Sequence, residues 1–156
     1  MVAGLARAGV RCVVIGGVAG TAHGSRRVTD DLDICYDPAP DNRARLAELL
    51  AAWHAYPRGV EPGLPFVMDA LTLERAPILT LTTDEGDLDC FDQVQGVGTY
   101  AAVAAASEPV TVGEVGFRVL ALPALVKAKR AAGRPKDREA LLELEALHAL
   151  KRRGGR

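Results

Sequence analysis

The sequence predicts an α/β (α+β) fold that ends in a pair of helices. Short β-rich runs such as Val13–Ile15 alternate along the chain with segments of helical period, and two strand-like runs carry carboxylates at alternate positions. With 156 residues, 49% of them apolar, the chain suits a single domain over residues 1–156 with one core. The net charge of -1 does not by itself indicate a nucleic-acid or membrane partner.

The expected elements follow one another with short turns. We expect helices over 2–8, 18–23, 41–54, 99–106, 123–131 and 135–151, with Asp41 and Thr99 as N-caps and Gly133 ending the penultimate helix. We expect strands over 11–15, 32–36, 70–73, 78–82 and 87–94, and short strands within 110–120. The segment 57–65 (PRGVEPGLP) has three prolines and two glycines, so it is expected to be a loop.

The cysteines and the hydropathy indicate the cellular compartment of the protein. Cys12, Cys35 and Cys90 form no Cys-x-x-Cys pair, which disfavours a zinc site and favours reduced thiols in a cytoplasmic protein. The first ten residues are too short and too mixed for a signal peptide, and no segment approaches the length of a membrane span. We therefore expect no membrane partner.

Two carboxylates on one strand form the strongest candidate site. Side chains alternate along a strand, so Asp31 and Asp33 share a face while Leu32 and Ile34 take the other. Charges on an otherwise apolar strand are costly unless solvent or a cation compensates them. The pattern favours Mg²⁺ near a nucleoside triphosphate, and the alternative is an edge strand with a solvated face.

Two further features support a site of this kind. Gly16 and Gly17 stand between a strand and a helix, where a polyphosphate can approach the backbone closely and meet the helix N-terminus, although such turns are also common for structural reasons. A third carboxylate is expected from the later acidic strand. Asp89, between Leu88 and Cys90, is favoured over Asp87, which follows Gly86.

Together these motifs resemble the nucleotidyltransferase superfamily with the DNA polymerase β-like core. The resemblance rests on Ile-Gly-Gly at 15–17, Arg-x-Thr-x-Asp-Leu-Asp at 27–33, Gly-x-Leu-Asp at 86–89 and the late segment at 125–137. It is strongest to the small AbiEii-like members. It implies a mixed β-sheet with helices packed mainly on one face, and in the family context a cognate toxin or antitoxin chain as partner.

The resemblance also implies a reaction. Asp31, Asp33 and Asp89 would be catalytic and would hold two Mg²⁺ ions, with Mn²⁺ as a substitute, so that a nucleotide passes from an NTP to a hydroxyl acceptor and pyrophosphate is released. The nucleotide-binding residues would be Gly16, Gly17, Arg27, Thr29, Lys129 and Lys136. The acceptor, whether an RNA 3′ end, a protein or a small molecule, is left open.

Other interpretations remain at this stage. Arg27 can instead pair with Asp30 or Asp37 on the surface, and Lys129 and Lys136 can be ordinary surface charges near helix ends. The chain as a whole can be a non-catalytic module that binds a nucleotide or a partner on the same fold. A glycosyltransferase with an Asp-x-Asp motif fits less well, because such domains generally need a longer chain.

Overall fold

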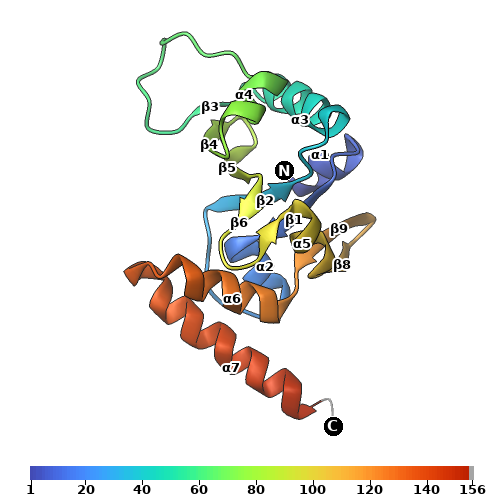
Figure 1. Cartoon of the computed structure of the whole chain (residues 1–156), viewed down its shortest axis with the longest axis vertical. Helices are drawn as coiled ribbons and strands as arrows, with labels where there is room; N and C mark the ends of the chain where they lie inside the picture. The colour runs from blue at the N-terminus through green and yellow to red at the C-terminus, as the bar shows by residue number, and fades with distance from the viewer. Residues whose placement is uncertain (155–156) are drawn as a thin grey trace.

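A mixed β-sheet forms the centre of the protein. The computed structural model describes residues 1–154, leaving out the side chain of Lys136, and its seven-stranded sheet has the order β3-β4-β5-β2-β1-β9-β8 (Figure 1). The pairs β2–β5 and β1–β9 are parallel and the other neighbours are antiparallel. The strands are β1 (Cys12–Ile15), β2 (Asp31–Tyr36), β3 (Tyr56–Pro57), β4 (Ile78–Thr83), β5 (Gly86–Phe91), β8 (Ser107–Val112) and β9 (Val115–Leu120). A separate hairpin consists of β6 (Gln93–Val94) and β7 (Gly98–Thr99).

The described residues also form seven α-helices. They are α1 (Val2–Arg7), α2 (Gly16–Ala22), α3 (Pro40–Ala52), α4 (Ala70–Arg75), α5 (Tyr100–Ala105), α6 (Leu122–Ala132) and α7 (Arg138–Gly154). A short 3₁₀ turn (Pro135–Asp137) joins α6 to α7. In Figure 1, α7 and the long loop between β3 and α4 lie at opposite ends of the molecule. The predicted C-terminal helical pair is therefore present as α6 and α7.

The two faces of β2 have different neighbours. The hydroxyl of Tyr36 donates to the carbonyl of Leu73 in α4 at 2.9 Å, which places α4, with α3 packed against it, on the face of Leu32, Ile34 and Tyr36. The other face carries Asp31, Asp33 and Cys35. There α6 and α7 stand across a cleft instead of packing directly on the acidic residues. Helices thus cover one face of β2 closely, whereas the other face is open to the cleft at Asp31 and Asp33.

The core is continuous through the centre of the sheet. Side chains on both faces of the central strands are almost fully buried, among them Val13, Val14, Ile34 and Cys35. Burial of an aliphatic side chain of this kind contributes about 1.5–3 kcal/mol, so these strands form a rigid platform for the residues at their ends. Within residues 1–154, no helix combines the length and the apolar character that crossing a bilayer requires.

Several predicted elements differ from the structure: the predicted loop 57–65 begins inside β3, the predicted strand 87–94 is divided between β5 and β6, and two further differences concern helices. Residues 70–73 were expected to be a strand, but they begin α4, because the Asp69 side chain accepts from the Thr72 backbone N–H at 2.8 Å and caps a helix. Asp41 is not the N-cap of α3, since Ala39 occupies that position and Asp41 lies in the first turn, paired with Arg11. The mixed sheet, in contrast, is confirmed.

Candidate active site

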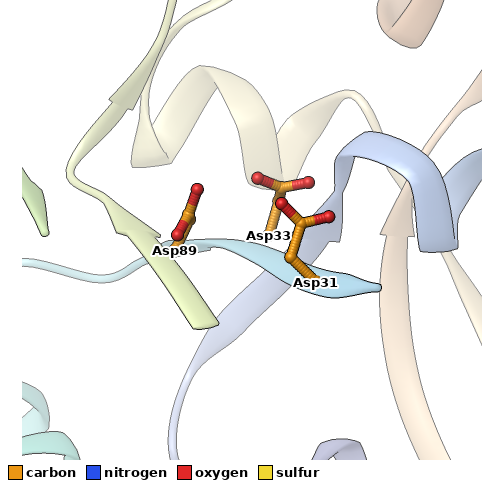
Figure 2. Close-up of side chains that lie close together, drawn as sticks. All are labelled: Asp31, Asp33 and Asp89. Atoms are coloured by element: carbon orange, nitrogen blue, oxygen red, sulfur yellow. The ribbon is translucent and has the colours of Figure 1, made fainter. Parts of the chain in front are cut away.

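Three carboxylates from two neighbouring strands converge on one side of the sheet (Figure 2). Asp31 and Asp33 come from β2 and Asp89 from β5, and the parallel register sets Asp33 opposite Asp89. Figure 2 shows the three side chains pointing to the same side of the sheet. One oxygen from each lies within 4.8 Å of the others. We call this group the acidic triad, and it contains the same three residues that the sequence predicted as metal ligands.

The donor set of the acidic triad suits a hard divalent cation. Carboxylate oxygens are the ligands that Mg²⁺ and Mn²⁺ prefer, and the triad offers neither nitrogen nor sulfur. Burial, followed by the negative charge of Asp31, raises the pKa of Asp33 above its ordinary value. The positive charges of Lys129 and Arg134 act in the opposite direction. A bound cation would relieve the repulsion that raises this pKa.

The two glycines are required by their close neighbours. Gly16 has a φ of +63°, and a Cβ at this position would lie 2.0 Å from the Asp33 Oδ2. A Cβ on Gly17 would lie 2.7 Å from the Thr29 side chain. The Gly17 backbone N–H also donates to the Asp33 carboxylate and lowers its pKa. These glycines therefore let the turn into α2 press against the acidic strand, and their predicted contact with phosphate stays a prediction.

A cleft of about 1140 Å³ opens over the acidic triad. The sheet and the start of α2 form one side, and α6 and α7 form the other through residues such as Ala128 and Leu144. Glu143 of α7 holds the far wall in place, because its carboxylate accepts from the Ser25 hydroxyl at 3.0 Å and from the Arg26 N–H at 2.9 Å. The cleft is large enough for a nucleotide, since ligand pockets typically measure about 300–1,000 Å³.

Basic side chains from the C-terminal segment line this cleft. Lys129 on α6 donates to Asp137 at 2.8 Å, and Arg134 donates to the other oxygen of Asp137 at 2.5 Å. Burial alone would raise the pKa of Asp137, but these two hydrogen bonds hold it below its ordinary value. Asp137 is only 6% exposed, so it fixes both cations beside the cleft. Lys136, the other predicted phosphate contact, has its side chain outside the described part of the structure.

The remaining predicted residues have contacts that the sequence did not indicate. Arg27 lines the cleft and pairs with Glu139 of α7 at 3.2 Å, not with Asp30 or Asp37. The Thr29 hydroxyl donates to the Asp31 Oδ1 at 2.8 Å. Thr29 thus orients a carboxylate of the acidic triad, while Arg27 links the loop before β2 to the opposite wall.

Sequence reasoning assigned no role to Arg134 or Asp137, and it missed one further residue at the site. Arg58, the first residue after β3, extends its guanidinium to Asp89, and its Nη1 lies 3.4 Å from the Asp87 Oδ2. Asp87 itself accepts from the Thr82 hydroxyl at 2.9 Å and stands opposite Asp31 in the register. A lone arginine in a loop rich in proline and glycine carries no local signal, and only the pairing of β3 with β4 brings it to the acidic strands.

Comparison with known proteins supports the class of fold. The chain is similar to a solved structure from Thermotoga maritima described as a "putative nucleotidyltransferase", with a TM-score of 0.56 and 14% identity over 86% of this chain and 81% of that one. No protein-family model matches the sequence, and no curated protein matches it. The protein therefore has a nucleotidyltransferase-like fold. At this level of identity the likeness extends to the fold alone.

Proposed function

We propose that the protein is a Mg²⁺-dependent nucleotidyltransferase that transfers NMP from an NTP to a hydroxyl acceptor. The observation that carries the proposal is the acidic triad, three carboxylates from two strands that converge within 4.8 Å at the floor of a nucleotide-sized cleft. The acceptor oxygen forms a bond to the α-phosphorus, the bond to the β-phosphate oxygen breaks, pyrophosphate leaves, and the hydroxyl proton passes to water.

Asp31, Asp33 and Asp89 of the acidic triad would hold the divalent metal through their carboxylate oxygens. Bound Mg²⁺, or Mn²⁺ in its place, supplies positive charge that lowers the pKa of the acceptor hydroxyl and stabilises the leaving pyrophosphate. Thr29 keeps the Asp31 carboxylate oriented through its 2.8 Å hydrogen bond. Asp33 is held by the Gly17 N–H.

The triphosphate would lie toward the basic wall of the cleft. Lys129 and Arg134 already lower the pKa of Asp33 through their charge, so their field reaches the acidic triad. Arg27 would approach the same phosphates from the loop before β2, and the proposal keeps Gly16 and Gly17 as their backbone contacts. Asp137 would position Lys129 and Arg134 without touching the nucleotide.

The biological setting forms a finer part of the proposal. The Gly-Gly and Arg-x-Thr-x-Asp-x-Asp motifs support a relation to the small AbiEii-like nucleotidyltransferases, with a cognate toxin or antitoxin chain as partner. Cys12, Cys35 and Cys90 are all free thiols, which supports a reducing cytoplasmic setting where NTPs are available. Growth arrest on induction of the wild type but not of Asp31→Asn would support the toxin role, whereas equal growth would remove it.

The reaction is tested with α-³²P-labelled ATP, GTP, CTP and UTP, Mg²⁺ or Mn²⁺, and RNA, protein and small-molecule acceptors. We expect labelled acceptor and released pyrophosphate with the wild type, and loss of both with Asp89→Asn. Asp87→Asn is the matched control, because Asp87 lies on the same strand and outside the acidic triad, and it should keep most of the activity. Equal labelling by the wild type and Asp89→Asn would contradict the proposal.

A non-catalytic nucleotide-binding or partner-binding module is the alternative function. It would be supported if NTPs raised the thermal midpoint of the wild type while no acceptor became labelled under any condition tested.

A further inference from the structure

The guanidinium of Arg58 forms ion pairs with members of the acidic triad. Its Nη2 donates to the Asp89 Oδ1, and its Nη1 lies 3.9 Å from the Asp31 Oδ2 and 3.4 Å from the Asp87 Oδ2. A single guanidinium therefore contacts three carboxylates from β2 and β5. Among the side chains that the structure describes, no other Lys or Arg forms an ion pair with a member of the triad.

The contact differs from the other basic contacts around the cleft. Lys129 and Arg134 are bound by Asp137, which is outside the acidic triad, so they face the cleft without filling it. Arg58 instead bonds directly to Asp89, a carboxylate predicted to ligate the metal. The Arg58 side chain is 30% exposed, so part of it borders solvent. Its backbone N–H is fixed, since it donates to the Thr80 carbonyl at 2.9 Å.

These contacts imply a conflict with a bound metal. Mg²⁺ requires nearly octahedral oxygen ligands at about 2.0–2.1 Å and keeps several of its waters, which leaves little space for a guanidinium on the same carboxylates. Two cations on shared ligands also repel each other strongly where water is partly excluded. Because the Arg58 backbone is anchored to β4, the side chain can leave by rotation while the loop base stays in place.

We infer that Arg58 competes with the divalent cation for Asp89 and Asp31, so that its side chain gates the metal site and must withdraw before the metal binds. The inference rests on the proposed function, because it assigns the regulation of that same site. It predicts that metal affinity in the wild type is lower than the acidic triad alone would provide, and that metal binding releases Arg58 to solvent.

The first test measures Mn²⁺ binding directly, by titration calorimetry or by the electron paramagnetic resonance of free Mn²⁺. Arg58→Gln should bind Mn²⁺ about 10- to 100-fold more tightly than the wild type, the range for losing one competing charge-assisted hydrogen bond. Arg43→Gln is the matched control. Arg43 lies on α3 and pairs with Glu74 at 3.0 Å, so this variant removes the same charge elsewhere and should bind Mn²⁺ as the wild type does.

The second test follows Arg58 in the wild-type protein. Phenylglyoxal modifies accessible guanidinium groups, and peptide mass spectrometry reports each arginine separately. Mg²⁺ should increase modification of Arg58 and leave Arg11, which is paired with Asp37 and Asp41, unchanged. Circular dichroism of each variant establishes that it is folded before its affinity is compared.

The outcomes separate this inference from the proposed function. Equal or weaker Mn²⁺ binding by folded Arg58→Gln, or Arg58 modification that does not respond to Mg²⁺, would overturn the inference while leaving nucleotidyl transfer to its own assay. Absence of Mn²⁺ binding by Arg58→Gln would overturn the inference together with the metal site. Tighter Mn²⁺ binding by Arg58→Gln, without transfer to any acceptor, would support the gate and overturn the proposed reaction.

Discussion

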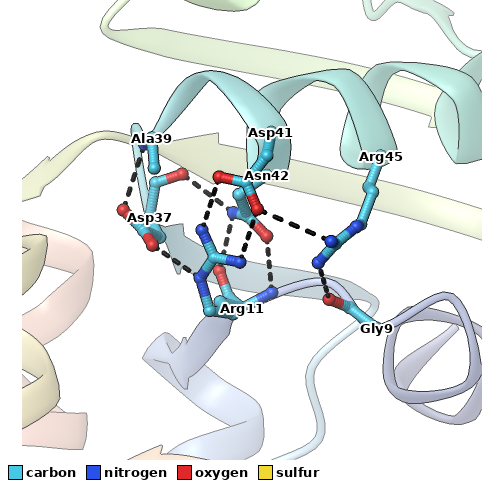
Figure 3. A network of polar contacts seen from close by, with 7 residues as sticks. All are labelled: Gly9, Arg11, Asp37, Ala39, Asp41, Asn42 and Arg45. Carbon is cyan, nitrogen blue, oxygen red and sulfur yellow. Dashed lines mark hydrogen bonds and ion pairs between the residues drawn. The ribbon is translucent and has the colours of Figure 1, made fainter.

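The carboxylates at the two ends of β2 have opposite electrostatic environments. Beyond the last residue of the strand, Asp37 and Asp41 are bonded by Arg11, which donates to Asp37 at 2.7 Å and to the two oxygens of Asp41 at 2.9 and 3.0 Å (Figure 3). Asn42, fully buried, donates to the carbonyls of Arg11 and Asp37 and accepts from the Arg11 N–H at 2.7 Å. We call these residues, together with Arg45, which pairs with Asp41 at 3.6 Å, the Arg11 network, and its two positive charges match its two negative ones.

At the opposite end, the acidic triad has more negative charge than its neighbours compensate. Arg58 is one guanidinium against Asp31, Asp87 and Asp89, and it donates no hydrogen bond to Asp33. The consequence is visible in the pKa values, since hydrogen bonds from Arg11 lower the pKa of Asp41 to about 2, whereas burial and Asp31 raise that of Asp33. At one end of β2 the carboxylates are neutralised by arginines of the protein itself, and this end contributes to folding. At the other end the negative charge is not fully neutralised, which favours the binding of a cation.

Asp33→Asn tests this difference between the two ends of β2 with the largest expected effect. We expect nucleotidyl transfer to fall by roughly 10²–10³-fold, the scale on which one electrostatic stabiliser acts. Because the folded pKa of Asp33 is raised, ionisation of Asp33 opposes folding as pH rises above its ordinary range. The neutral variant should therefore have a higher thermal midpoint than the wild type at pH 7 in EDTA. If Asp33→Asn were less stable than the wild type and kept its transfer activity, Asp33 would have a structural role and the contrast between the two ends of β2 would be wrong.

A complementary change at the other end is Asn42→Leu. It keeps a similar volume but leaves the Arg11 N–H and two carbonyls without their partner, so the free energy of unfolding should fall by about 3 kcal/mol. Urea denaturation measures this loss. Transfer activity per folded molecule should be unchanged, because Asn42 touches no residue of the cleft, and a loss of activity in fully folded protein would show that the Arg11 network is not purely structural.

Asp137→Asn tests whether a carboxylate that is already paired within the protein also contributes to nucleotide binding. Without its charge, Lys129 and Arg134 lose their common anchor, and we expect the KM for NTP to rise about tenfold, the effect of one charge-assisted hydrogen bond. The kcat should change less. Steady-state kinetics on the folded fraction gives both values, and Lys129→Gln provides the comparison. An unchanged KM in both variants would place the triphosphate elsewhere in the cleft.

The smallest expected effect is a dependence of stability on acid pH. The folded pKa of Asp41, about 2, lies below its ordinary value of 3.8, so its hydrogen bonds to Arg11 stabilise the fold above about pH 4, and this stabilisation is lost as the pH falls toward 2. The difference in unfolding free energy between the wild type and Asp41→Asn should shrink over this window. Urea titrations at pH 2, 3, 4 and 6 measure it, and a constant difference would mean that Asp41 does not titrate with the fold.

Local patterns predicted much of the site. Alternation along a strand was enough to set Asp31 and Asp33 on one face, because the direction of a side chain depends on its own backbone. Asp89 was favoured over Asp87 because it stands between the apolar Leu88 and Cys90, whereas Asp87 follows Gly86. Gly133 ends α6 with a φ of +60°, as its position indicated. The roles of these residues in binding metal and nucleotide stay predictions for the experiments above.

Contacts between distant segments could not be predicted in this way. Residues 70–73 have strand-like composition, but Asp69 caps them as a helix and Tyr36 bonds to that helix from another element. Arg27 meets Glu139 only because α7 returns across the cleft. In the contacts of Tyr36 and Arg27 the partner lies more than thirty residues away. The Asp69 cap, in contrast, is local and outweighs a weak β-propensity.

The sequence by itself determined which residues share a face, where the glycine turn stands and which side chains can serve as oxygen ligands. These properties depend on backbone geometry and chemistry within a few residues. Only the tertiary structure decided that β2 and β5 run parallel with Asp33 opposite Asp89, and that Arg58 reaches the acidic triad from a loop. Strand pairing and side-chain reach depend on the packing of the whole sheet, and no local pattern encodes them.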